Sequence, residues 1–419
     1  MRSSTIALAS VVALLFGCVG QASAQTADVQ ALQQQVDALR AQLELMQKQY
    51  EERLAALEAR LSGAAPEGAA AAAAAPAEAA PPPAAGTPTP NAKVFNPDMA
   101  VIGNFLGAAG RNRVNPAPAL EMRESEVSFQ AIVDPYARAD FFLSFGQDGV
   151  SLEEGFLTFP TLPGGLLMKV GKMYGAFGKT NTLHSHVIPW TDRPLVMNNL
   201  LGGEEPFGDA GVSVARLIPN PWAFLEATGQ VMRGDSENLF HSSRRSDLTY
   251  VGHLRGYQDI TENTNIDLGA SYARGHNAAG IVNDVDAGRF QTELWGADAT
   301  LRWKPLQRSI YHSFVGRSEA VWSRRQQFAG LQESFGYYVS GDYQFARRWF
   351  AGVRYDDSAR ADASSVRDRG QSAVLTYWPS EFSQVRGQYR RTRYGDASVA
   401  NELLFQFQFS IGAHGAHAF

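Results

Sequence analysis

The sequence predicts an all-β transmembrane protein, a 16-stranded antiparallel outer-membrane β-barrel that is preceded by an α-helical coiled coil. The first observation is a change of period: from Phe95 onward apolar and polar residues alternate in sixteen segments of strand length. The second is that tight turns alternate with longer loops, as periplasmic turns and extracellular loops do in outer-membrane barrels. The third is that no segment after the N-terminal apolar run approaches the ~20 consecutive apolar residues of a transmembrane helix.

Residues 1–24 have the pattern of a secretory signal peptide. Arg2 precedes an apolar run, and Ala22-Ser23-Ala24 forms an A-x-A cleavage site. The alternative is a lipoprotein signal at Cys18, but Phe16 fits that cleavage pattern poorly. Because Cys18 is the single cysteine and lies in the segment to be removed, we expect neither disulfides nor thiolate chemistry in the mature chain.

Residues 25–61 are the predicted coiled coil, because apolar residues recur there at spacings of three and four. The alternative is a single amphipathic helix that lies on another surface. Residues 62–93 are almost only Ala, Pro, Gly and Thr, which indicates an extended linker. An even strand number places both barrel ends in the periplasm, so the coiled coil is expected there, with peptidoglycan as a candidate partner.

Residues 94–419 are the predicted barrel, and the loop at about 174–207 is its predicted constriction. A barrel of 16 strands is too wide for side chains alone to fill, and this third loop is the longest. It is also apolar enough to pack inside, through Val187, Ile188, Trp190, Leu195 and Val196. Another long loop is expected at 324–333.

Strand parity sorts the charged residues into a lipid face and a lumen face, because a charge facing lipid at mid-membrane costs about 2–4 kcal/mol. The predicted pore-lining residues are Arg138, Asp140, Lys169, Arg255, Arg302, Arg354, Arg386 and Arg390. The same parity adds Arg317, Glu124, Glu126, Glu226, Asp267, Asp298, Glu319 and Asp342. The constriction loop contributes Lys179, Asp192, Arg193, Glu204 and Glu205. The predicted lumen therefore carries both positive and negative charges. The alternative for any one of these residues is that it forms an ion pair with a residue on a neighbouring strand.

Composition and motifs argue against several other classes of protein. The charge is mildly acidic, with 37 Lys+Arg against 42 Asp+Glu, so a nucleic-acid partner is not expected. No nucleophile is paired with a base, and no cofactor motif is present, although a barrel lipase or protease remains an alternative. His184 and His186 have metal-ligand character, but the sequence places no third ligand beside them, and His414 and His417 indicate a site no better. No metal and no cofactor are therefore predicted.

Two segments resemble the phosphate-selective porin family. The segment "VSLEEGFLTFPTLPGGLLMKVGKMYGAFGK" (150–179) is similar to the strand, turn and strand that lead into that family's constriction loop. "WTDRP" (190–194) and "GGEEPFGDAGVSVARL" (202–217) are similar to the return from the loop. The resemblance is best over 94–220. It implies a 16-stranded porin, commonly trimeric, with a periplasmic coiled coil in some members.

The resemblance implies that the protein is a porin, but it does not imply that the solute is phosphate. Phosphate-specific members depend on an arginine ladder and a lysine cluster, and no residue-by-residue match is found here. Lys169, Lys172 and Lys179 lie near the corresponding region, but the lumen charges are balanced.

The predicted function is passive diffusion of small hydrophilic solutes or ions, with anions such as phosphate as candidates, through the outer membrane of a Gram-negative bacterium. The alternative is a structural tether whose coiled coil contacts the cell wall or a periplasmic partner. A TonB-dependent receptor would need 22 strands and a folded plug. The alternating stripe of 403–411 is the predicted closing strand, and Phe419 is similar to the aromatic signal read by the barrel-assembly machinery. Membrane lipid and lipopolysaccharide are the other expected partners.

Overall fold

The computed structural model describes residues 97–146, 149–236 and 239–412 of the 419-residue chain. The predicted signal peptide, coiled coil and linker, and Phe419, lie outside the described residues. The strands are β1 (Asp98–Arg111), β2 (Leu120–Asp134), β3 (Ala137–Gly146), β4 (Gly149–Leu162), β5 (Leu166–Tyr174), β6 (Gly208–Leu217), β7 (Phe224–Met232), β8 (Thr249–Thr261), β9 (Thr264–His276), β10 (Ile281–Val282), β11 (Val285–Asp286), β12 (Gln291–Trp303), β13 (Ser313–Gln327), β14 (Gly330–Ala346), β15 (Trp349–Ala359), β16 (Arg367–Ser380), β17 (Ser383–Arg393) and β18 (Val399–Gly412). The helical segments are η1 (Thr180–Thr182), α3 (Leu195–Leu200), η2 (Ala278–Gly280) and η3 (Leu306–Arg308).

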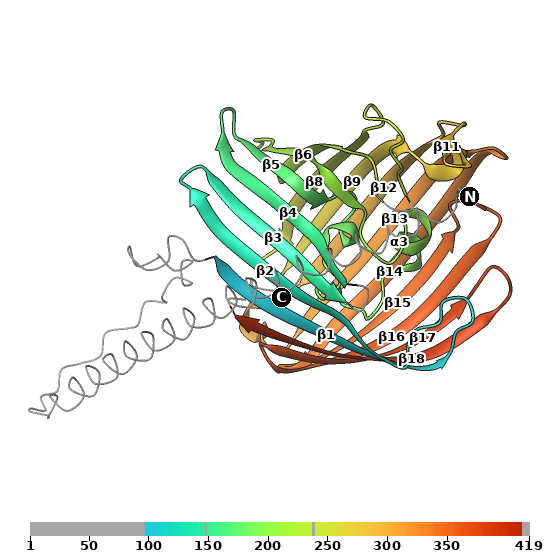
Figure 1. Cartoon of the computed structure of the whole chain (residues 1–419). Helices are drawn as coiled ribbons and strands as arrows, with labels where there is room; N and C mark the ends of the chain where they lie inside the picture. The colour runs from blue at the N-terminus through green and yellow to red at the C-terminus, as the bar shows by residue number, and fades with distance from the viewer. Residues whose placement is uncertain (1–96, 147–148, 237–238, 413–419) are drawn as a thin grey trace, which may run out of the picture. The chain divides into compact units, whose positions relative to one another are not determined.

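Sixteen of these strands form one closed antiparallel barrel, which confirms the predicted fold of this part of the chain (Figure 1). Each strand pairs with its neighbours in the chain, and only the short hairpin β10–β11 stands outside the ring. The last strand closes on the first, with Phe407 opposite Phe105 and Leu403 opposite Ala109. Closure leaves no strand edge with unpaired backbone groups, as lipid requires.

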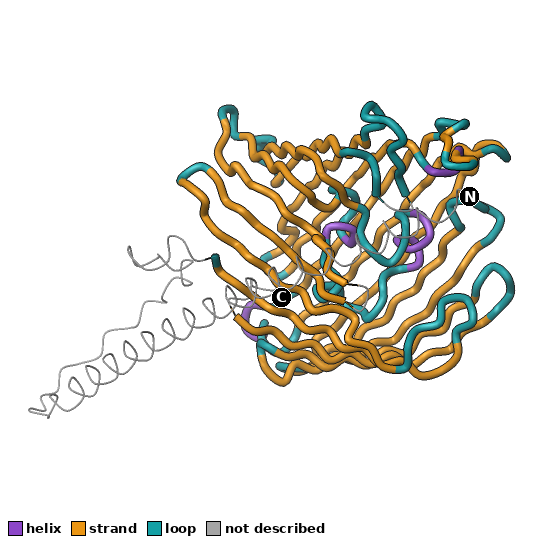
Figure 2. The backbone as a smooth tube through the Cα atoms, in the orientation of Figure 1, coloured by secondary structure: helices purple, strands orange, loops and turns teal. Residues whose placement is uncertain are grey.

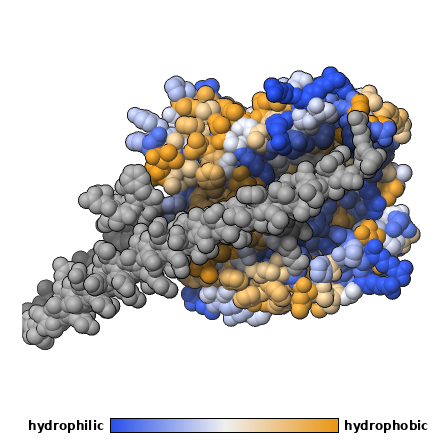
Figure 3. Space-filling model, viewed as in Figure 1, coloured by the Kyte–Doolittle hydropathy of each residue, from blue (hydrophilic) through white to orange (hydrophobic). Residues whose placement is uncertain are grey.

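The faces of the strands follow the predicted parity. In β18 the apolar side chains Leu403, Phe405 and Phe407 are exposed on the outer wall, whereas Gln406 and Gln408 are buried inside. The face visible in Figure 3 carries apolar side chains over the strands, with hydrophilic side chains gathered at the strand ends. This exposed apolar wall is the surface that lipid covers in an outer-membrane barrel.

The connections alternate in length over most of the ring. One departure is the connection 304–312, which carries η3 where the alternation calls for a tight turn. The long loop expected at 324–333 is wrong: β13 runs to Gln327 and β14 begins at Gly330, so the strands are joined by a tight turn. Gly330 in this turn has a positive φ of 112°, a conformation that glycine adopts without steric cost. The polar run "SRRQQ" therefore continues a strand beyond the apolar band.

β-Bulges interrupt the strand pairing in the first part of the barrel. The register of β1 against β2 shifts between Asn104 and Phe105, and the register of β3 against β4 shifts between Phe142 and Leu143. In the second bulge Phe142 faces Glu154 and Leu143 faces Leu152, so Glu153 is the extra residue. An extra residue interrupts the alternation of faces, and consecutive side chains then point to the same side.

No helix in the described residues is long and apolar enough to cross a membrane.

Candidate functional site

The long loop between β5 and β6, residues 175–207, lies inside the barrel and is called the inner loop below (Figure 2). It carries η1 and α3, and its apolar side chains pack together against the barrel wall. Ile188, Trp190 and Val196 are buried as predicted, while the expectation for Val187 is wrong, because it is 39% exposed. The helix α3 packs against β14 and β15, so this part of the inner loop lies inside the barrel and does not extend outside it.

The first attachment of the inner loop is to Glu319 on β13. This buried carboxylate accepts the backbone N–H of Lys179 at 3.1 Å and that of Thr180 at 2.8 Å. It also accepts the hydroxyls of Thr180 and Tyr338. Gly178, at φ 60°, brings the chain so close that a Cβ there would contact the Glu319 carboxylate. The loop start is therefore pinned by several donors on one acceptor.

The second attachment gathers basic side chains around Asp267 on β9. Lys179 Nζ lies 2.8 Å from Asp267 Oδ2, and Arg255 donates to both carboxylate oxygens at 2.9 and 2.8 Å. Arg302 approaches at 3.8 Å. The side chains of Lys179, Arg255 and Arg302 are 30%, 40% and 34% exposed, whereas that of Asp267 is 3% exposed. Water in the lumen therefore meets three cations around a covered carboxylate.

The third attachment joins Asp192 of the inner loop to the opposite group of arginines. Asp192 Oδ2 lies 2.9 Å from Arg354 on β15 and 2.9 Å from Arg390 on β17. Its Oδ1 accepts the side-chain amide of Gln388. Burial alone would raise the pKa of Asp192, but Arg354 and Arg390 lower this pKa overall, well below its ordinary value. The carboxylate is thus firmly ionised in the folded barrel.

Two further arginines bind backbone carbonyls rather than facing open lumen. Arg386 on β17 is 3% exposed and donates to the carbonyls of Ile188 and Trp190 at 3.1 and 2.9 Å. Arg193 of the inner loop is also 3% exposed and donates to Thr180 and Leu183. Both hold the inner loop in its fold.

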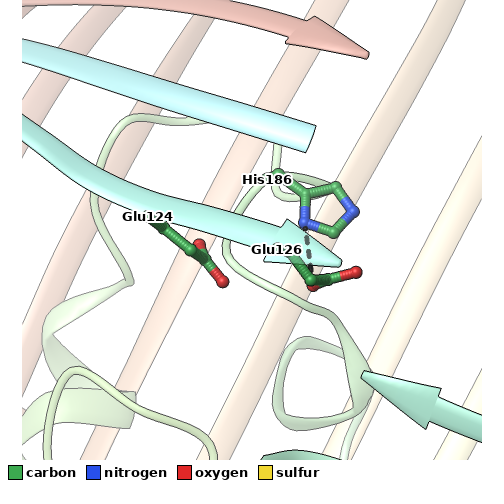
Figure 4. Close-up of side chains that lie close together, drawn as sticks. All are labelled: Glu124, Glu126 and His186. Carbon is green, nitrogen blue, oxygen red and sulfur yellow. Dashed lines mark ion pairs between the residues drawn. The ribbon is translucent and has the colours of Figure 1, made fainter. Parts of the chain in front are cut away.

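The side chains of the inner loop also meet a cluster of carboxylates on β2 and β4. His184 Nδ1 lies 2.9 Å from Glu126 Oε2 and 2.9 Å from Glu153 Oε2, and its Nε2 lies 3.0 Å from Glu154 Oε2. Burial alone would lower the pKa of His184, but these carboxylates raise it to about 12. His186 Nδ1 lies 3.4 Å from Glu126 Oε2 (Figure 4). The sequence places no third ligand beside these histidines, and the structure brings carboxylates from two strands to them.

Sequence reasoning placed Glu126 in the lumen but missed Glu153 and Glu154, because strict alternation allows only one of two consecutive residues to face inward. The bulge at Glu153 brings both inside, where each contacts His184. One signal was available: an ordinary strand would expose one of the two carboxylates to lipid, at a cost of about 2–4 kcal/mol at mid-membrane. Adjacent acids inside a predicted membrane strand thus indicate a bulge.

The other predicted charged residues lie apart from these attachments. Arg138 pairs with Asp140 at 2.8 Å within β3, and Lys169 on β5 lies over the Phe156 ring at 4.2 Å. Glu204 pairs with Arg123 at 3.4 Å and is exposed. Glu205 lines a cavity of about 310 Å³ beside β2 and β4. None of these contacts holds the part of the inner loop that crosses the barrel.

The inner loop crosses the lumen almost directly. Thr180 binds Glu319 on β13, and His184 binds Glu126 on β2. In the ring order β13 lies nearly opposite β2. The segment between these residues is short and begins with the 3-10 helix η1, which is more compact than an extended chain, so the side chains of Glu319 and Glu126 reach inward to meet it. Any passage through the barrel therefore runs beside this crossing.

Comparison with known proteins places the chain in a family and identifies its fold. It is 30% identical over 350 residues to an uncharacterized protein of Aquifex aeolicus, covering 75% of this chain and 73% of that protein. The chain belongs to the same family as this protein. No family model matches the sequence.

Solved structures similar to the chain are porins and outer-membrane channels. An anion-selective porin from Comamonas acidovorans aligns with a TM-score of 0.52 at 9% identity, covering 75% of this chain and 98% of that one. The outer membrane channel DcaP of Acinetobacter baumannii aligns with a TM-score of 0.49 at 12% identity, covering 75% and 96%. The first alignment shows that this family member has the 16-stranded porin fold.

Proposed function

We propose that this protein is an outer-membrane porin that lets small hydrophilic solutes or ions diffuse passively through its barrel. The observation that carries the proposal is the inner loop, held by ionic contacts inside a closed barrel whose outer wall is apolar. A barrel of 16 strands leaves an aqueous lumen unless something fills it. A loop pinned across that lumen narrows the passage without replacing it.

The selectivity that fits the exposed charges is a preference for anions. Lys179, Arg255 and Arg302 present partly exposed cations beside the covered Asp267. Cations exposed to the lumen attract anions and repel cations as solutes pass. Arg354 and Arg386, which are 3% exposed, contribute to loop structure instead. Phosphate, the solute suggested by the family resemblance, is one anion to test.

The assembly and location follow from the same proposal. The barrel resides in the outer membrane of a Gram-negative bacterium, in contact with lipid and lipopolysaccharide, and assembles as a homotrimer through the barrel-assembly machinery. The predicted coiled coil of 25–61 would lie in the periplasm, which stays a prediction. A tether to the cell wall stays a prediction, since its residues lie outside the described part of the chain.

Planar-bilayer recording tests the proposal. Purified full-length protein should insert with stepwise conductance, and a salt gradient should give a reversal potential of the sign expected for anions. Folded barrels that insert and stay silent would overturn the channel. Stepwise conductance with a cation-selective reversal potential would overturn only the anion preference.

A further inference from the structure

We propose that His184, His186, Glu126 and Glu153 bind one divalent transition-metal ion, with Zn²⁺ as the best-fitting ion. The ligand atoms of Glu126, Glu153 and His184 lie within 4.8 Å of one another, and so do those of Glu124, Glu126 and His186 (Figure 4). Glu126 belongs to both groups. The set of His184, His186, Glu124, Glu126, Glu153 and Glu154 is called the His–Glu cluster below.

The distances suit a metal centre. Glu126 Oε2 lies 2.9 Å from His184 Nδ1 and 3.4 Å from His186 Nδ1, and Glu153 Oε2 lies 2.9 Å from His184 Nδ1. Zinc binds imidazole nitrogen and carboxylate oxygen at about 2.0–2.2 Å, so neighbouring ligands around it stand about 3–3.5 Å apart. These three donor pairs stand at such separations, and Glu126 is common to two of them. The two triads share Glu126, so His184 and His186 would turn towards it to meet at one ion.

The supporting contacts orient the donors as outer groups do around metals. His184 Nε2 is bonded to Glu154 Oε2 at 3.0 Å, which leaves Nδ1 directed at Glu126 and Glu153. A carboxylate on the far nitrogen of a metal-binding histidine fixes its tautomer and raises its basicity. Glu153 Oε2 also accepts the hydroxyl of Tyr174 at 2.7 Å. The second layer of a metal site is thus present.

An independent observation is the excess of negative charge, because the carboxylates in the cluster outnumber the one imidazolium, His184, that contacts three of them. Glu124 is 6% exposed, and its buried Oε1 has no hydrogen-bond partner among the described residues. Within that part of the chain, none of the four carboxylates of the cluster pairs with a lysine or arginine. Lys172 nearby donates to the carbonyl of Leu152 instead. Buried carboxylates are costly unless paired or bound to a metal. A divalent cation would supply the missing charge and would displace the proton from His184 Nδ1 as it binds.

A cavity beside the cluster gives the ion a path of entry, and the ligand types determine which ion binds best. Glu124 and Glu153 line the cavity of about 310 Å³ that borders the cluster. Two imidazole nitrogens favour zinc and its transition-metal neighbours over Ca²⁺ and Mg²⁺, which prefer oxygen ligands alone. Bound there, the ion would join the inner loop to β2 and β4.

The experiment measures Zn²⁺ binding to full-length protein in detergent after treatment with EDTA. Isothermal titration and elemental analysis should show one Zn²⁺ per chain at the cluster. A His184→Ala/His186→Ala variant should bind at least about 100-fold more weakly, and Glu154→Gln about 10-fold more weakly. His414→Ala/His417→Ala, a matched pair outside the described residues, should bind like the wild type.

Folding is checked by the heat-dependent gel shift of intact barrels. A second measurement uses the wild type alone. X-ray absorption at the zinc edge should show imidazole nitrogens in the coordination shell of the bound ion. Failure of the wild type to bind, equal binding by the His184/His186 variant, or a shell of oxygens alone would overturn the site. These measurements do not depend on conductance, so they can fail while the proposed channel stands.

Discussion

Asp192 of the inner loop and Arg354 of β15 form an ion pair of 2.9 Å across the barrel interior, between residues 162 positions apart in the chain. Arg354 also lies over the ring of Trp190, 4.8 Å from its centroid, so the loop covers its own anchor. The side chain of Arg354 is 1% exposed, and that of Asp192 is 13% exposed. Each partner has a second one: Asp192 also contacts Arg390 at 2.9 Å, and Arg354 also contacts Asp356 at 2.8 Å, so the pair is the link between the inner loop and a buried ionic network.

The first prediction is that Asp192→Asn detaches this part of the inner loop. Removing one partner of a buried ion pair costs up to about 3–5 kcal/mol. The cost is smaller here, because Arg354 keeps Asp356 and Arg390 keeps Glu402, and it is expected mostly as a loss of local loop stability. Single-channel recordings should show larger current fluctuations in the open state, with the barrel still folded. Asp396→Asn, which changes an exposed loop carboxylate, is the matched control, and an equally quiet Asp192→Asn channel would contradict the prediction.

The second prediction concerns the pH dependence of the same contact. Because the folded pKa of Asp192 is depressed, its stabilising contribution is present above the ordinary aspartate pKa of about 3.9 and disappears as pH falls through the folded value. Wild-type channels should therefore keep their quiet open state from pH 7 to about pH 4 and lose it only in stronger acid. Recordings of wild type and Asp192→Asn over this range test it. A loosening of the wild type near pH 6 that the variant lacks would refute it.

The third prediction separates selectivity from loop support. Arg255→Gln removes a partly exposed cation, and a unit charge about 5 Å from a passing ion is worth about 0.8 kcal/mol in water, less after screening by salt. The anion-to-cation permeability ratio should fall about threefold to fivefold, as read from reversal potentials.

Arg386→Gln should behave differently, because its guanidinium is buried and bonded to the carbonyls of Ile188 and Trp190. The expected result is a noisier channel with nearly unchanged reversal potential. Arg391→Gln, on the exposed side of the same strand, controls for the loss of charge. A selectivity change from Arg386→Gln as large as that from Arg255→Gln would show that Arg386 meets the solute.

The fourth prediction is that Gly178→Ala weakens the attachment at Glu319. Alanine at φ 60° is strained by about 1–3 kcal/mol, and its Cβ would press on the Glu319 carboxylate. Unfolding in a denaturant series should begin earlier, with altered conductance. Gly229→Ala is the control, since a Cβ there has nothing within 4 Å. Equal effects of the two substitutions would argue against a specific contact.

The barrel follows from sequence because lipid imposes a simple rule on each strand. The stripe of Leu403, Phe405 and Phe407 faces outward as the alternation requires, and the strand that carries it closes on β1. The same rule fails at Glu153, where a bulge adds one residue to β4. The rule also fails beyond the apolar band, where β13 continues through Arg324 and Arg325. A strand that stands in water needs no apolar face, so its sequence does not alternate and gives no sign of the strand.

The partners of the inner loop were harder to infer. Sequence places Asp192, Arg354 and Arg390 on the right elements, but their meeting depends on how a loop folds across a space that many strands enclose. The same holds for His184, whose partners come from two strands brought together by register. Contacts between residues so far apart in the chain have no periodic signature.

The crossing of the inner loop has a mechanical consequence. Its ends are fixed to β13 and β2 on nearly opposite sides of the ring, with further anchors on β15 and β17. If lateral pressure flattened the barrel, the distance between some of these anchoring strands would have to increase and the distance between others would have to decrease. The loop therefore acts as a cross-brace, and the cylinder keeps its round section because of the segment that narrows it.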